Sequence, residues 1–290
     1  MSLTYDKVAA IGRTGDANSV PLSLLTTGKA NPKTGKGEKR GYRTAILHLS
    51  PARLSGFEVC AGRTPGCTAA CLNVAGRGGM ETREPSRLHV ARLRRTRYFK
   101  RDKRGFGLML EREIVKHERD AAREGLIPVV RLNGNSDLPY ENVTFTWADG
   151  TAGTVFDRFP HLQFYDYTKV ISRLRKPLPA NYDLTFSLAD GNDDAAREAI
   201  ELGFRVAVVF RNTERPSAKV WTLPAEWQGR PVIDADATDL RFLEPAGVYA
   251  GLRAKGLAKG DTTGFVKETR EEAITLGRAI AGADRAAPKP

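Results

Sequence analysis

The stretch IPVVRLNGNSD, residues 127–137, has the form that decides the fold: a short apolar run that ends abruptly in polar side chains. Such a run is typical of a strand that is buried on both faces of a parallel sheet. The same form recurs along the chain, separated by segments long enough to cross over the sheet. The seven predicted strands lie in TAILHL (44–49), IPVVRLNGNSD (127–137), LQFYDYTK (162–169), DLTFSLADGND (183–193), RVAVVFRN (205–212), RPVIDADATD (230–239) and GVYAGLRAKG (247–256).

Buried strands that alternate with crossovers predict an α/β fold. Seven of them, each ending in polar residues, favour a modified or incomplete (β/α)8 TIM-like barrel; an open parallel α/β sheet is the alternative. We expect a single barrel-like domain over residues 42–267. Residues 1–41, rich in Gly, Lys, Thr and Pro, are predicted to be a flexible basic segment. Residues 268–290 are predicted to be a C-terminal helix and tail.

The long connection after the first strand is predicted to be helical from Pro85 onwards, with Gly105 and Gly107 dividing it into two helices. One face of the second helix is apolar, because its residues recur at i, i+4, i+7 and i+11: Leu110, Ile114, His117 and Ala121. A further helix is predicted over residues 193–203.

All three cysteines lie in CAGRTPGCTAAC, residues 60–71, with the spacing C-x6-C-x3-C. This loop follows the first strand, so a barrel would place it on the active face. Gly and Ala residues leave room for three thiolates to converge, and three thiolates with one open corner suit a [4Fe–4S] cluster. Zinc is the alternative, and it would need a fourth ligand such as His48 or His89. We expect Cys60, Cys67 and Cys71 to be the metal and cofactor ligands.

Polar side chains at the other strand ends predict a pocket beside the cysteines. Our preferred pocket residues, assigned as catalytic candidates, are Asn133 and Asp137 in RLNGNSD and Asp166 and Lys169 in FYDYTK. Such residues more often cap helices or pair with one another than take part in chemistry.

The net charge of +12 is concentrated in residues 29–43 and 83–104. Basic patches of this kind attract phosphate-rich partners, so both stretches are candidate nucleic-acid contacts. Neither a signal peptide nor an apolar run long enough for a membrane span is recognisable, which favours a cytoplasmic protein that does not contact membranes.

Five stretches in the same order resemble the phage "gene product 88" domain family over about residues 20–267: CAGRTPGCTAACLNVAGRG, VRLNGNSD, FYDYTK, VIDADATDLRFLEPAGVYAGLRAKG and TTGFV. The resemblance implies a phage-encoded protein that works in the bacterial host cytoplasm. The cysteine loop is also distantly similar to that of radical S-adenosylmethionine enzymes, which carry a three-cysteine [4Fe–4S] loop after the first strand of a partial barrel. That similarity implies a cluster on Cys60, Cys67 and Cys71. The usual C-x3-C-x2-C spacing and a Gly-Gly-Glu motif are both absent here.

The sequence therefore predicts an iron–sulfur protein with redox or radical chemistry on an unknown substrate, with S-adenosylmethionine as a further candidate ligand. The alternative is a nucleic-acid-binding protein without catalysis, in which zinc or a cluster stabilises the fold.

Overall fold

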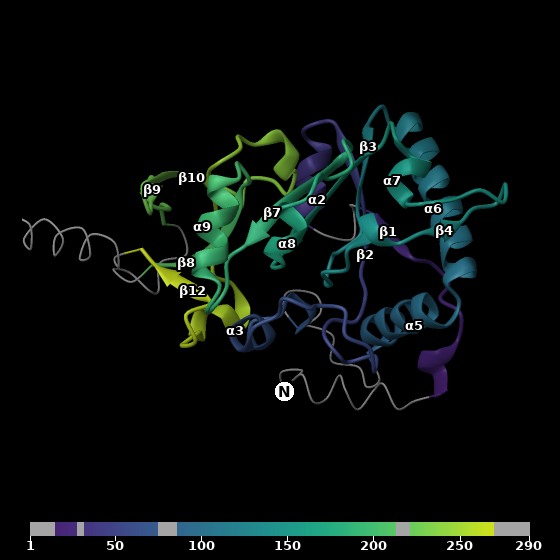
Figure 1. The fold of residues 1–290 in the computed structure, drawn as a ribbon, viewed down its shortest axis with the longest axis horizontal. Helices are drawn as coiled ribbons and strands as arrows, with labels where there is room; N and C mark the ends of the chain where they lie inside the picture. The colour runs from purple at the N-terminus through teal and green to yellow at the C-terminus, as the bar shows by residue number, and fades with distance from the viewer. Residues whose placement is uncertain (1–14, 28–31, 75–85, 213–220, 270–290) are drawn as a thin grey trace, which may run out of the picture.

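A mostly parallel sheet of ten strands organises the molecule (Figure 1). The computed structural model describes residues 15–27, 32–74, 86–212 and 221–269. In these residues the strand order is β1-β2-β3-β6-β7-β8-β11-β10-β9, and β12 also pairs with β8. The strands are β1 (Leu25–Thr27), β2 (Tyr42–Leu47), β3 (Ile127–Arg131), β6 (Gln163–Thr168), β7 (Tyr182–Ser187), β8 (Val206–Arg211), β9 (Glu226–Trp227), β10 (Arg230–Asp234), β11 (Tyr249–Arg253) and β12 (Val266–Glu268).

All seven predicted strands are present, and they are parallel neighbours. The α/β prediction is therefore confirmed. A closed barrel is not found in the described residues, where the sheet is open. Two features interrupt closure: β11 pairs between β8 and β10, so the chain doubles back, and the short antiparallel strands β1 and β9 occupy the two edges.

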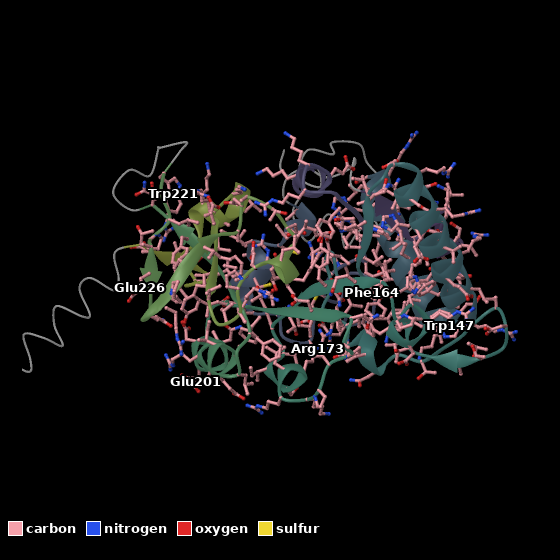
Figure 2. The ribbon with its side chains drawn as sticks, turned by 90° about the horizontal axis from the view of Figure 1, so that it is seen from above. Trp147, Phe164, Arg173, Glu201, Trp221 and Glu226 are labelled. Atoms are coloured by element: carbon pink, nitrogen blue, oxygen red, sulfur yellow. The ribbon has the colours of Figure 1, made fainter. Side chains whose placement is uncertain are left out.

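Helices cover one face of the sheet, where the main core forms. They are α5 (Arg87–Arg101), α6 (Lys103–Arg123), α7 (Val155–Arg158), α8 (Ile171–Leu174) and α9 (Asp193–Glu201). The predicted face of α6 is buried as expected, with Leu110 and Ile114 fully enclosed. Figure 2 places Phe164 near the middle of the molecule and Trp147 and Trp221 at its opposite ends.

The helical region divides at Asp102, and not at the glycine pair. Asp102 ends α5, and its carboxylate accepts a hydrogen bond from Gly105 N at 2.8 Å to begin α6. Gly107 lies inside α6 and packs closely against Phe145: a Cβ at this position would come within 2.8 Å of the Phe145 ring. The glycine therefore allows close packing and does not break the helix.

The other face of the sheet carries a second, more polar layer. Leu240 and Phe242, around the short turn η5 (Arg241–Leu243), pack against Tyr165, and α2 (Pro32–Glu38) lies beside them. The Arg131 guanidinium lies between the Tyr165 and Tyr167 rings and pairs with Asp239.

The N-terminal segment is partly ordered, contrary to our expectation for residues 1–41. Its β1 pairs with β2, and the Glu113 carboxylate accepts hydrogen bonds from Leu24 N and Leu25 N. The buried side chains of Leu24 and Leu25 and the Glu113 carboxylate on α6 together hold this segment against β2 as an edge strand. Residues 270–290, and with them most of the predicted C-terminal helix, lie outside the described residues. In the part of the chain that the structure describes, no helix is long and apolar enough to cross a membrane.

Candidate metal centre

The cysteine loop lies against the carboxyl ends of β3 and β6. Cys60 forms a parallel bridge with Asp137, and Asp137 N donates to Val59 O at 2.7 Å. Gly62 lies so close to the strand end that a Cβ would come within 2.8 Å of Lys169 Cβ. The backbone bridge to Asp137 and the close packing of Gly62 on Lys169 therefore hold Cys60 at the edge of the sheet where active sites of α/β proteins form.

Cys67 is held by the short helix α3 (Pro65–Ala69). Thr64 caps it by accepting from Cys67 N at 3.1 Å, and Asp190 accepts from Gly66 N at 3.0 Å and from the Thr64 hydroxyl. A Cβ on Gly66 would overlap the Thr263 hydroxyl, so α3 packs directly on the segment that leads into β12, as Figure 1 shows. Cys71 follows α3 and opens the turn η3 (Leu72–Val74).

The three cysteines form no disulfide bonds, and all three are half-buried. Burial, followed by weaker effects from Cys71, Asp137 and Cys67, raises the pKa of Cys60 to about 12. Burial is also the largest cause that raises the pKa of Cys71, and Cys67 adds to it. The charges of the three thiols thus influence one another, as expected for cysteines of one short loop. Within the described ranges, no three His, Cys, Asp or Glu side chains already stand at metal-binding spacing.

Burial raises the pKa of Cys71, and the positive charges of Arg92 and Lys169 are near enough to oppose that rise. Arg92 is only 7% exposed, and its guanidinium donates to the Asn73 carbonyl at 3.1 Å and to the Asn73 side chain. The Lys169 ammonium donates to Ser187 Oγ at 2.9 Å. Neither has an ion pair with a carboxylate among the residues described. The buried side-chain nitrogen of Asn73 also lacks a hydrogen-bond partner. This region therefore favours an anion.

Neither nearby imidazole offers a lone pair in this arrangement. His89 is buried, with Nδ1 2.7 Å from Ser86 Oγ and Nε2 3.0 Å from Asn73 O. His48 Nδ1 lies 2.8 Å from the Asn135 amide, which in its best-satisfied orientation donates to it and accepts from Arg92. Burial, followed by the charge of Arg92, lowers the pKa of His48 to about 3, so this ring is neutral. The geometry gives no support to a zinc site completed by either histidine.

The predicted pocket residues divide into two groups. Lys169 lies beside Cys71, and Asp137 lies beside Cys60 while accepting from Lys169 N at 2.8 Å and from Arg173 at 2.6 Å. Asn133 and Asp166 are buried beneath the loop: Asp166 accepts from Asn133 N at 2.9 Å, and Asn133 Oδ1 accepts from Leu138 N at 2.8 Å. Their partners make them supports of the RLNGNSD turn.

Our sequence reasoning missed Arg92 because a basic helix suggests a solvent-exposed surface. The signal was its position three residues from His89 and from Arg95, on a face that also carries apolar residues. Of the basic stretch 83–104, Arg92 and Arg95 are buried, whereas Lys100, Arg101, Lys103 and Arg104 are exposed. In the stretch 29–43, Arg43 is buried and pairs with Glu124. Residues 29–31 and 83–85 lie outside the described ranges.

A family model described as gene product 88 matches residues 23–269, which is most of the chain. The chain belongs to the gene product 88 family. The match includes the cysteine loop and every strand of the main sheet, so the resemblance noted from the sequence is confirmed for this family. No curated protein and no solved structure matches this gene product 88 protein significantly.

Proposed function

We propose that Cys60, Cys67 and Cys71 bind a [4Fe–4S] cluster and that this phage-encoded protein uses it for redox or radical chemistry in the host cytoplasm. The observation that carries the proposal is the position of the three-cysteine loop at the strand ends, beside two cations, Arg92 and Lys169, that form no ion pair with a carboxylate in the described part of the chain. A cluster on three thiolates is an anionic group, and a buried cation requires such a partner.

The donor set fits the group. Three thiolates are soft ligands that select iron–sulfur clusters or zinc. Neither His48 nor His89 is available as a fourth ligand. Asn73 adds backbone and side-chain N–H groups beside Cys71, and hydrogen bonds to sulfur tune the potential of a cluster.

When bound, the cluster would supply single-electron chemistry, and its open iron would accept a substrate or S-adenosylmethionine. The chain's own residues have simpler tasks. Lys169 and Arg92 offset negative charge at Cys71, Ser187 orients the Lys169 ammonium, and Asp137 fixes the strand end that carries Lys169. Because the pKa of Cys60 is raised, loading must release protons and is expected to be faster at higher pH.

Anaerobic reconstitution followed by iron and sulfide analysis tests the proposal. We expect about four irons and four sulfides per chain and broad absorbance at about 400 nm. Cys67→Ala and Cys67→Ser should lose most of both, whereas the exposed neighbour Leu72→Ala should retain them. Unchanged iron in the cysteine variants would remove the proposal. A colourless protein with one zinc would favour the alternative, a metal-stabilised nucleic-acid-binding protein.

A further inference from the structure

A basic stripe runs along α6 on the side opposite its buried face. Arg112, Lys116, Arg119 and Arg123 recur at i, i+4, i+7 and i+11, and all four are exposed. The buried side of the same helix carries Leu110, Ile114, His117 and Ala121. We call the four cations the α6 basic stripe. At about 1.5 Å per residue it extends for about 16 Å, which is long enough to meet more than one phosphate of a nucleic-acid strand.

The three acidic residues between these cations are Glu113, Glu118 and Asp120, and each contacts another part of the protein; Glu118 lies 2.6 Å from His161 Nε2. The Glu113 carboxylate accepts from the backbone of Leu24 and Leu25. Asp120 pairs with both Lys116 and Arg123, and also lies 3.9 Å from Arg43. Arg112 and Arg119 form no ion pair within the described part of the chain. The stripe therefore retains positive charge, at Arg112 and Arg119, that no ion pair among the described residues balances.

A groove follows the stripe. A hollow of about 450 Å³ lies between α6 and the edge strand β1. Arg112, Lys116 and Arg119 line one side of it together with Glu113 and Asp120, whose carboxylates already bind groups of the protein. The opposite side carries Thr27 and Leu22, whose side chain is 94% exposed. A flat solvated helix face would have no such opposing wall, so cations and groove together form a surface that fits an elongated anion.

We propose that the groove between α6 and β1 binds the sugar-phosphate backbone of a nucleic acid. Arginine donates in a planar fork that matches phosphate oxygens, and the spacing of one helical turn between cations allows successive contacts. An acidic peptide is the less favoured partner, because the groove offers Leu22 and Thr27 but no unpaired backbone donors at Leu24 and Leu25 to pair with a peptide strand. This site lies outside the basic stretches predicted from the sequence, and it does not depend on a cluster.

Fluorescence anisotropy with the full chain tests the proposal, using a labelled 20-nucleotide DNA single strand and its duplex over a range of salt concentrations. The double variant Arg112→Gln/Arg119→Gln should weaken binding about tenfold at low salt and reduce the slope of log K against log salt by about 1.4 to 1.8. The control double variant Arg197→Gln/Arg230→Gln removes the same charge from exposed sites on α9 and β10, and it should change affinity less than about twofold.

Thermal unfolding of both double variants should match that of the wild type, because all four arginines are exposed. Equal weakening by the two double variants would show that net charge alone attracts DNA, and it would overturn the assignment. So would absence of binding by the wild type at low salt. Displacement of DNA by poly-glutamate at matched charge concentration would assign the groove to acidic peptides instead.

Discussion

Two buried arginines at the carboxyl edge of the sheet have opposite surroundings. Arg173, labelled in Figure 2, is 6% exposed and pairs with Asp137 at 2.6 Å and Glu141 at 2.8 Å. Arg92 is nearly as buried, at 7% exposed, but in the described residues its guanidinium contacts only the neutral groups of Asn73 and Asn135. Burial and these partners shift their pKa values in opposite directions: that of Arg173 is raised, and that of Arg92 is lowered to about 10. A compensated cation stabilises the fold, whereas an uncompensated one marks a place for an anion.

The largest effect should follow from breaking the compensated cluster. Arg173→Met leaves the carboxylates of Asp137 and Glu141 buried without their partner, so we expect the free energy of unfolding to fall by about 3 to 5 kcal/mol. Urea unfolding followed by circular dichroism measures it. Arg175→Met is the matched control, because its pair with Glu198 is exposed to solvent and should change the free energy of unfolding far less. Equal effects of the two substitutions would show that Arg173 is not a structural anchor.

A smaller, pH-dependent effect is expected at Asp166. Burial raises its pKa to about 6, although Arg131 and the hydrogen bond from Asn133 N oppose the shift. Since the folded pKa lies above the unfolded value of about 3.9, the folded state binds the proton more tightly, and stability from this group falls as pH rises from about 4 to about 6.

Asp166→Asn removes this titration. The free energy of unfolding of the wild type minus that of the variant should therefore decrease by about 2 to 3 kcal/mol between pH 4 and pH 7, as measured by urea unfolding. A difference that is constant with pH, or one that increases, would contradict the raised pKa.

The smallest expected effect concerns Arg92. In iron-free protein, Arg92→Met should change the free energy of unfolding by less than about 1 kcal/mol, because no carboxylate is left behind and Asn73 O keeps its contact with His89. Loss of the positive charge should raise the pKa of Cys71 and slow its alkylation by iodoacetamide at pH 8 a few-fold.

Peptide-resolved mass spectrometry measures that rate, with the exposed Lys100→Met as the control on the same helix. If Arg92→Met destabilises as much as Arg173→Met, the two arginines are equivalent and the contrast between them fails.

The sequence predicted most of the sheet because each strand is a short apolar run, and burial on both faces leaves a clear pattern. The sequence did not show whether the sheet closes into a barrel. That depends on the pairing of β11 between β8 and β10, which joins residues far apart in the chain. The edge strand β1 was missed because three residues carry too little pattern. The helix break was misplaced because the effect of Gly107 depends on its packing against Phe145, whereas the cap at Asp102 is local.

For the candidate site, the clustering of cysteines identified the loop, but the surrounding cations were only partly recognised. Lys169 was predicted because it follows a strand. Arg92 was not predicted, because the sequence of a strongly basic helix does not show which of its arginines point toward the protein interior. Asn133 and Asp166 were predicted to line the pocket, and that role stays a prediction; the structure shows both side chains buried and hydrogen-bonded within the RLNGNSD turn.

One edge of β8 is shared: β7 pairs with its beginning at Val206 and Ala207, and β12 pairs with its end from Val209 to Arg211. The segment that leads into β12 is also the wall on which α3 rests, through Thr263 and Gly66. A cysteine loop near the start of the chain therefore meets its last support only when the residues around 261–268 have been synthesised. During translation the thiols would stay open to solvent until residues 261–268 have left the ribosome, so we expect the proposed metal loading to follow that point.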